Sequence, residues 1–114
     1  MTVDEIARRL NLKPITALSR LSSPCRGGYI SDLLSDVMAH AKAGDVWITL
    51  QVHPNVVAVA SLKEIAAVII IGGRKPETET LAKAEEEKIP LLLSDLPGFE
   101  IAGRLYEMGI RRTR

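Results

Sequence analysis

The chain has 114 residues, of which 46% are hydrophobic and 25% charged, and its formal net charge is +1. This length fits one hydrophobic core, and the balanced charge argues against a dedicated binder of nucleic acid or of anionic membranes. The single cysteine, Cys25, excludes an internal disulfide and any zinc or iron–sulfur site built from several thiolates of one chain. We therefore expect neither a metal nor another cofactor.

The sequence also indicates a compartment. Residues 1–10 mix acidic, basic and apolar side chains, unlike the apolar core of a secretory signal. The longest apolar stretches, 56–60 and 66–71, are much shorter than the roughly 20 residues of a membrane span. A free cysteine is typical of a reducing interior, so we expect a cytoplasmic protein with no membrane partner.

The first predicted elements lie in residues 1–30. Thr2 and Glu5 have capping-box spacing, and the apolar residues that follow share one helical face. We expect this helix to end near Asn11, because Pro14 cannot continue it. An extended piece at 15–18, a loop over 22–28 and a brief strand at 29–30 follow.

A second helix is predicted over residues 32–42, with Ser31 as its N-cap. Its apolar face would hold Leu33, Leu34, Val37, Met38 and Ala41, and its outward face Asp32, Ser35, Asp36 and His40. Strands are then predicted at 46–52, 67–71 and 90–93, with helices from Pro54, over 77–88 and over 97–108. Ser94 or Asp95 would cap the last helix.

Alternating strands and helices predict right-handed crossovers onto a largely parallel sheet. The fold class we expect is α/β, as a single three-layer domain over residues 1–110 with a mixed, mostly parallel sheet flanked by helices. Residues 111–114 would form a flexible basic tail.

The segment RGGYISDLLSDVM at residues 26–38 resembles the signature region of the DRTGG domain family. Further similar segments follow in the same order at 44–49, 53–60, 67–71 and 100–106. The chain departs from the family where Pro24-Cys25-Arg26 stands in place of Asp-Arg-Thr. From that part of the signature, only Gly27 and Gly28 carry over as candidate ligand-binding residues.

This resemblance implies a fold like the N-terminal domain of HPr kinase/phosphorylase. Members of the family occur inside phosphotransacetylases, inside pyrophosphatases beside CBS domains, and as short proteins encoded near iron-hydrogenase or redox genes. The family is regarded as regulatory or ligand-sensing and often dimeric. The resemblance therefore implies a homodimer without catalytic residues.

Ligands of open parallel sheets bind beyond the carboxyl ends of the strands. Three predicted loops meet there, and each precedes a helix N-terminus that favours an anion. The alternative is that these residues only form turns and helix caps. The candidate ligand-binding residues in the three loops are Thr49, Gln51, His53 and Asn55, then Gly72, Gly73 and Arg74, then Ser94 and Asp95.

Other titratable residues have both a functional and a structural interpretation. His53 could bind an anion, accept a proton or be phosphorylated, whereas His40 lies one helical turn after Asp36. Arg26 could lower the thiol pKa of Cys25 and make it reactive. Asp32 and Asp36 could form a metal pair, but two carboxylates without a third ligand more simply form a solvated face.

The leading functional hypothesis is a non-enzymatic regulatory module that binds a small anionic metabolite or a nucleotide at the carboxyl edge and acts on a partner enzyme. A second hypothesis is a scaffold or accessory protein of a redox or iron-hydrogenase complex, without a cofactor of its own. A third is a small transferase or phosphoryl carrier that uses His53. We expect no nucleic-acid partner.

Overall fold

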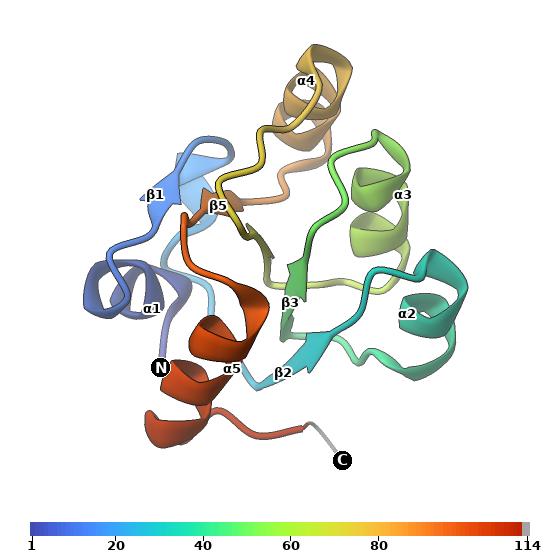
Figure 1. Ribbon diagram of the computed structural model, residues 1–114. Coiled ribbons are helices and arrows are strands. Elements are labelled where there is room, and N and C mark those ends of the chain that lie inside the picture. The colour runs from blue at the N-terminus through green and yellow to red at the C-terminus, as the bar shows by residue number, and fades with distance from the viewer. Residues whose placement is uncertain (113–114) are drawn as a thin grey trace.

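Helices and strands alternate along the chain in the computed structural model, which describes residues 1–112 (Figure 1). The elements, in chain order, are α1 (Val3–Arg9), β1 (Lys13–Pro14), the 3-10 helix η1 (Leu18–Arg20), β2 (Gly27–Ile30), α2 (Leu34–His40), β3 (Asp45–Thr49), α3 (Asn55–Leu62), β4 (Ala67–Ile70), α4 (Thr78–Glu87), β5 (Leu91–Leu93) and α5 (Gly98–Glu107).

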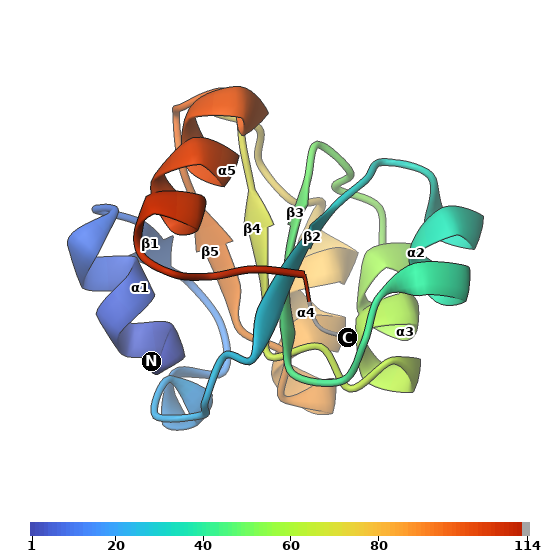
Figure 2. The same cartoon turned by 90° about the horizontal axis from the view of Figure 1, so that it is seen from below.

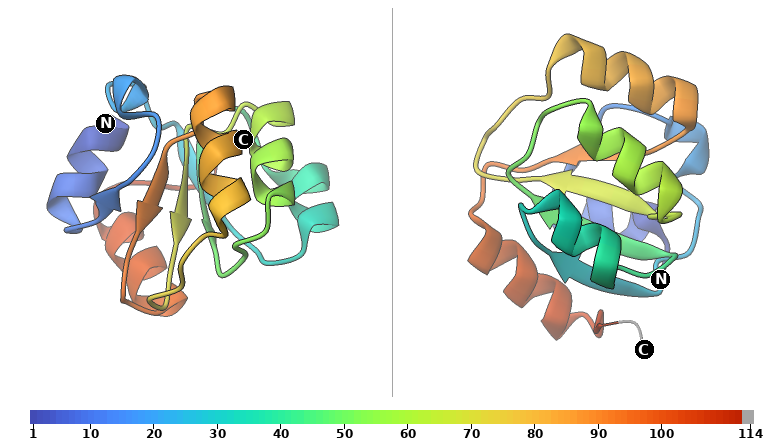
Figure 3. Two further views of the ribbon diagram at one scale, coloured as in Figure 1. Left: turned by 90° about the horizontal axis from the view of Figure 1, so that it is seen from above. Right: turned by 90° about the vertical axis from the view of Figure 1, so that its right-hand side faces the viewer.

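The strands form one mixed sheet in the order β1-β5-β4-β3-β2. Strands β2 to β5 are parallel neighbours, and β1 pairs antiparallel with β5 at one edge. Each of α2, α3 and α4 connects two adjacent parallel strands, and these three helices lie side by side on one face of the sheet (Figure 3). The mostly parallel sheet expected from the sequence is confirmed.

Two hydrophobic clusters fill the space between the sheet and its helices, one on each face of the sheet. In β3, Val46 and Ile48 join α1 and α5 in the first cluster, whereas Trp47 joins α2, α3 and α4 in the second. The residues of β4 and β5 alternate in the same way, as the period of two along a strand requires. Figure 2 shows the result, a sheet with α1 and α5 on one side and the other three helices opposite. The expected three-layer α/β domain is confirmed.

The central strands explain why the sequence indicates this fold so clearly. Every residue of β3 and β4 is buried, so both strands are almost continuously apolar, as expected of parallel strands covered on both faces.

The helix at the N-terminus forms as predicted. The Glu5 amide donates to Thr2 Oγ1 at 3.2 Å, and the Thr2 amide donates to Glu5 Oε1 at 3.4 Å, which completes the capping box.

Two predictions between residues 10 and 30 are wrong. The extended piece lies at Lys13–Pro14 rather than 15–18, because β1 is an edge strand, where proline breaks no ladder hydrogen bond. Ala17 adopts a positive φ of 50°, and the chain turns there into η1. Gly27 and Gly28 belong to β2 rather than to a loop.

The predicted N-caps of two helices are also wrong. Helix α2 begins at Leu34, because Ser31 Oγ accepts the Leu33 amide within the preceding turn and caps no helix. Leu33 is 64% exposed and Met38 39% exposed, so neither belongs to the core. Helix α5 begins at Gly98 with Pro97 at its N-cap, and neither Ser94 nor Asp95 caps it.

The chain after α5 returns to the sheet. Ile110 is buried, and the Gly28 amide of β2 donates to the Arg111 carbonyl at 3.0 Å. The Arg111 guanidinium lies 3.7 Å from the centre of the Tyr106 ring, a cation–π contact. Arg111 therefore contacts both β2 and α5. The flexibility of the tail from 111 onward stays a prediction, and residues 113–114 of that tail lie outside the described residues. None of the helices in residues 1–112 has the length and apolar character needed to cross a bilayer.

The hydroxyl of Thr16 connects the segment after β1 to β5, and its contribution to stability can be measured. Its buried hydroxyl donates to the Ile89 carbonyl at 2.8 Å and accepts the Leu91 amide at 2.9 Å. Thr16→Val keeps the shape of the side chain but leaves both backbone groups unpaired. We expect a loss of unfolding free energy on the order of 3 kcal/mol, since each buried unpaired group costs about 1–3 kcal/mol.

The matched control is Thr16→Ser, which keeps the hydroxyl and removes one methyl group. It should cost only about 1 kcal/mol. Chemical denaturation followed by circular dichroism measures both values. Equal losses of unfolding free energy in the two variants would show that the Thr16 hydroxyl does not stabilise the contact between β5 and the segment after β1.

Candidate functional site

The carboxyl ends of β2, β3, β4 and β5 lie along the same side of the sheet, which we call the carboxyl edge. Hydrogen bonds join the loops that follow these strand ends. The Gly72 amide donates to the Leu96 carbonyl at 2.9 Å, and the Gly73 amide donates to the Ser94 carbonyl at 2.9 Å. These bonds connect the loop after β4 with the loop after β5. The structure therefore brings together the loops predicted to form the site.

Asp32 lies in the loop after β2 and forms hydrogen bonds with the loop after β3. Its Oδ1 accepts Thr49 Oγ1 at 2.9 Å and the Leu50 amide at 2.7 Å, and its carbonyl accepts Gln51 Nε2 at 2.9 Å. Asp32 is exposed, as predicted, but it lies in the loop before α2 rather than on the helix itself. Thr49 is buried and its hydroxyl also accepts the Gln51 amide at 3.1 Å, so it is occupied within the protein.

Sequence reasoning missed Asp32 because it assigned this residue to α2. A signal was available, since an aspartate two residues after a strand and two before a helix is typical of turns whose carboxylate accepts nearby amides. Asp32 positions the loop after β3 through its Oδ1 and its carbonyl oxygen.

His53 and Asn55 lie at the start of α3, and both are exposed. The Asn55 amide donates to His53 Nδ1 at 3.0 Å. Because Nδ1 accepts this bond, the neutral ring carries its proton on Nε2, which can donate to a ligand. The loop also contacts α4, where the Glu77 amide and Thr80 Oγ1 both donate to the Val52 carbonyl, at 3.2 and 2.7 Å.

Gly72 and Gly73 have positive φ angles of 67° and 70°, which glycine adopts without strain. The loop after β4 leads to α4 and the loop after β5 leads to α5, on opposite faces of the sheet. The hydrogen bonds from Gly72 and Gly73 join these two loops. Arg74 is exposed and forms no ion pair within the part of the chain that the structure describes.

Ser94 and Asp95 have different surroundings. Ser94 is buried, and its Oγ accepts the Leu96 amide at 3.1 Å. Asp95 is exposed, and its Oδ1 lies 3.3 Å from the place where a Gly73 Cβ would stand. Its carboxylate lowers the local preference for an anion. The residues at this edge that remain open to a ligand are His53, Asn55, Arg74 and Asp95.

Gly27 and Gly28 do not join this group. Gly27 pairs with Asp45 and Gly28 with Val46, at the amino ends of β2 and β3 and so at the opposite edge of the sheet. A Cβ on Gly28 would lie 3.2 Å from Ile110 Cγ2. Glycine here allows the segment after α5 to approach β2, which is a structural role.

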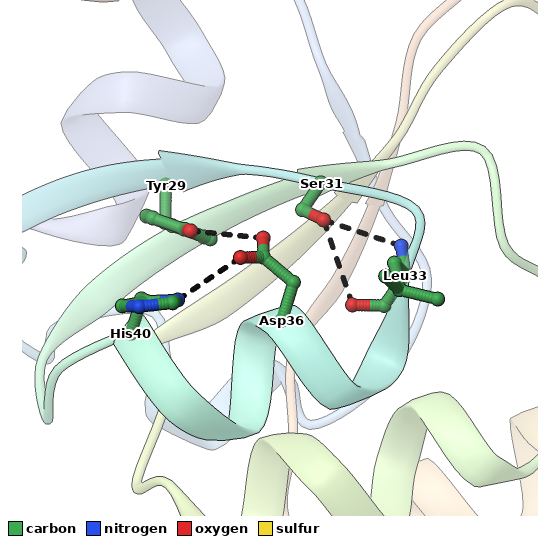
Figure 4. A network of polar contacts seen from close by, with 5 residues as sticks. All are labelled: Tyr29, Ser31, Leu33, Asp36 and His40. Atoms are coloured by element: carbon green, nitrogen blue, oxygen red, sulfur yellow. Dashed lines mark hydrogen bonds and ion pairs between the residues drawn. The ribbon is translucent and has the colours of Figure 1, made fainter.

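A polar network connects β2 to α2 (Figure 4). Tyr29 Oη donates to Asp36 Oδ2 at 2.8 Å, and His40 Nδ1 lies 3.0 Å from Asp36 Oδ1. Hydrogen bonds from the Ser31 and Tyr29 side chains lower the pKa of Asp36. The hydrogen bond to Asp36 in turn raises the pKa of Tyr29. Asp36, predicted to lie on the outward face of the helix one turn before His40, contacts His40 and also connects α2 to the edge strand β2.

Cys25 is buried, and its Sγ donates to the Gly27 carbonyl at 3.3 Å. Burial raises the pKa of this thiol, which contradicts the expectation that Arg26 lowers it. No group of three or more His, Cys, Asp or Glu side chains with metal-binding geometry occurs within residues 1–112.

The fold resembles that of a protein of known structure. The CBS and DRTGG domains of the regulatory region of a Clostridium perfringens pyrophosphatase, complexed with the activator diadenosine tetraphosphate, superpose with a TM-score of 0.74 at 16% sequence identity. The match covers 99% of this chain and 50% of the other, so the chain spans about half the length of that structure. No family model matches the chain, and no curated protein matches its sequence. The likeness shows a DRTGG-related fold.

The Tyr29–Asp36 contact predicts a coupled titration. Its contribution to stability should be lost as pH falls through the lowered pKa of Asp36, and as pH rises through the raised pKa of Tyr29. Asp36→Asn removes the carboxylate, so the Tyr29 pKa should fall toward its ordinary value of about 10. Absorbance titration of tyrosinate, in a Tyr106→Phe background, measures it. An unchanged Tyr29 titration in Asp36→Asn would contradict the assignment.

The burial of Cys25 predicts an unreactive thiol. An aromatic disulfide reagent should label the folded protein at least about a hundredfold more slowly than the denatured chain, because labelling requires local opening. The control is Ser35→Cys in a Cys25→Ala background, which places a thiol on the exposed side of α2. Equal labelling rates for the two thiols would show that Cys25 is accessible.

Proposed function

We propose that this protein is a non-catalytic regulatory module that binds a small anionic metabolite and acts on a partner enzyme. The first candidate for that metabolite is a nucleotide. The observation that carries this proposal is the match of nearly the whole chain to a regulatory region crystallised with a nucleotide activator. The site residues support it as well, since the exposed His53 and Arg74 at the carboxyl edge can donate hydrogen bonds to an anion.

The carboxyl edge offers a defined set of donors to such a ligand. His53 presents Nε2, Arg74 presents an unpaired guanidinium, and α3 contributes the positive end of its dipole. The two side chains come from neighbouring loops that the Glu77–Val52 hydrogen bond connects. An anion between them would draw the loops after β3 and β4 together.

The same edge has features suited to a partner protein. Phe99, in the first turn of α5, is 90% exposed, and Leu33, before α2, is 64% exposed. Phe99 follows the loop after β5, and Leu33 lies in the loop after β2. These two loops are hydrogen-bonded to the loops after β4 and β3, which carry Arg74 and His53. A shift caused by a bound anion would therefore move an apolar contact surface, and a homodimer or a partner enzyme could use that surface.

Thermal unfolding in the presence of nucleotides, acyl phosphates and sugar phosphates tests the proposal. The buried Trp47 donates from Nε1 to the Ser31 carbonyl at 2.8 Å and reports on unfolding by fluorescence. A ligand at about a hundred times its Kd adds about 2.7 kcal/mol, which raises the midpoint by about ten degrees in a domain of this size. Arg74→Ala and His53→Ala should abolish the shift.

The matched control is Arg9→Ala, which removes an exposed charge from α1. A shift that persists in Arg74→Ala and His53→Ala would overturn the location of the site. If no ligand of the panel shifts the midpoint, the sensing function is wrong, and the scaffold hypothesis takes its place.

A further inference from the structure

A hollow lies at the edge of the sheet opposite the carboxyl edge, where the parallel strands begin. It has a volume of about 500 Å³, and its lining includes the residue immediately before each of β2, β3, β4 and β5. Binding sites for small molecules usually have volumes of about 300–1,000 Å³. The cavity is therefore large enough for a mononucleotide or a sugar phosphate.

The lining carries three cations, Arg20, Arg26 and Lys88. None of them forms an ion pair with any residue among 1–112. Two carboxylates, Glu64 and Glu87, share the cavity, and Glu87 accepts a hydrogen bond from Ser61 Oγ at 3.3 Å. The lining has a net charge of +1, three cations less two carboxylates, and combines unpaired cations with hydrogen-bond acceptors.

The backbone fixes Arg26 in this cavity. Its amide donates to the Gly44 carbonyl at 2.8 Å, and the Gly44 amide donates to the Glu64 carbonyl at 2.9 Å. A Cβ on Gly44 would lie 2.9 Å from Arg26 Cδ, so the aliphatic stem of the arginine packs directly on the glycine. A side chain held in this way loses less freedom when it binds a ligand.

Lys88 and Glu64 occupy backbone positions that favour glycine. Their φ angles are 60° and 54°, and they follow α4 and α3 in the turns that lead into β5 and β4. Gly44, directly before β3, also has a positive φ, of 83°. Of the four non-glycine residues with positive φ in the described chain, two line this cavity, and Asn11 and Ala17 do not.

We infer that this cavity binds a small phosphomonoester that carries hydroxyl groups, such as a mononucleotide or a pentose phosphate. Arg20, Arg26 and Lys88 would hold the phosphate, and Glu64 would accept hydroxyl groups of the sugar. This site is separate from the one proposed at the carboxyl edge, since the two lie at opposite ends of the same strands. It does not depend on the proposed function.

The decisive variant is Lys88→Gly, because it separates a binding role from a structural one. Glycine relieves the strained turn, so the melting midpoint should rise by a few degrees. The same change removes the ammonium group, so the Kd for ribose 5-phosphate should increase about tenfold or more, the value of one charge-assisted hydrogen bond. A purely structural lysine would leave the Kd unchanged.

The experiment is a titration of the full chain with ribose 5-phosphate and with inorganic phosphate, followed by amide chemical shifts and calorimetry. We expect shifts at residues 43–44, 64–66 and 87–89. Arg26→Ala should weaken both probes, whereas Glu64→Gly should weaken ribose 5-phosphate more than inorganic phosphate. Lys83→Ala, an exposed charge of α4 that does not line the cavity, is the matched control and should change neither.

The outcomes for the two proposed sites are distinct. Unchanged Kd values in Arg26→Ala and Lys88→Gly, or no binding at millimolar concentrations, would overturn the cavity site. Shifts confined to residues 50–55 and 72–75, with binding lost in Arg74→Ala, would overturn it while supporting the carboxyl-edge site. Binding that is lost in Lys88→Gly and kept in Arg74→Ala supports the cavity site alone.

Discussion

Parallel pairing of β2, β3, β4 and β5 is the constraint from which the rest of this structure follows. Neighbouring parallel strands require a crossover each time, so every strand begins at one edge of the sheet and ends at the other. Helices then cover both faces, and the described residues of β3 and β4 are entirely buried. Polar side chains that can meet a small ligand are therefore concentrated at the two edges, which are formed by different kinds of turn.

At the carboxyl edge, the chain uses most of its polar groups to hold its own loops. Asp32 accepts hydrogen bonds from the loop after β3, and the loops after β4 and β5 bond to each other through Gly72 and Gly73. This arrangement satisfies buried polar groups, as a stable fold requires. It also means that a ligand there would depend on a few exposed side chains, chiefly His53 and Arg74.

The sequence predicts those parts of the fold whose signals are local. The apolar runs of β3 and β4 identify a buried parallel sheet, and the capping box at Thr2 identifies α1. Several failures involve distant partners. The loop before α2 includes Asp32, whose carboxylate accepts a hydrogen bond from Thr49, 17 residues away. Gly28 lies in a strand that also contacts Arg111, and the cavity at the amino edge gathers cations from three separate turns. No pattern of neighbouring residues reports such contacts.

The turns at the amino edge show where stability and side-chain chemistry conflict. Three of them place a residue in the left-handed region: Gly44 directly before β3, Glu64 two residues after α3, and Lys88 directly after α4. Glycine adopts this conformation with the least strain at all three positions. Glycine occurs only at position 44, where the Arg26 stem leaves no room for a Cβ. At positions 64 and 88 the cavity has room, and the chain carries a carboxylate and an ammonium at a backbone cost of about 1 kcal/mol each. The proposed phosphomonoester site gives both side chains a function that glycine could not perform.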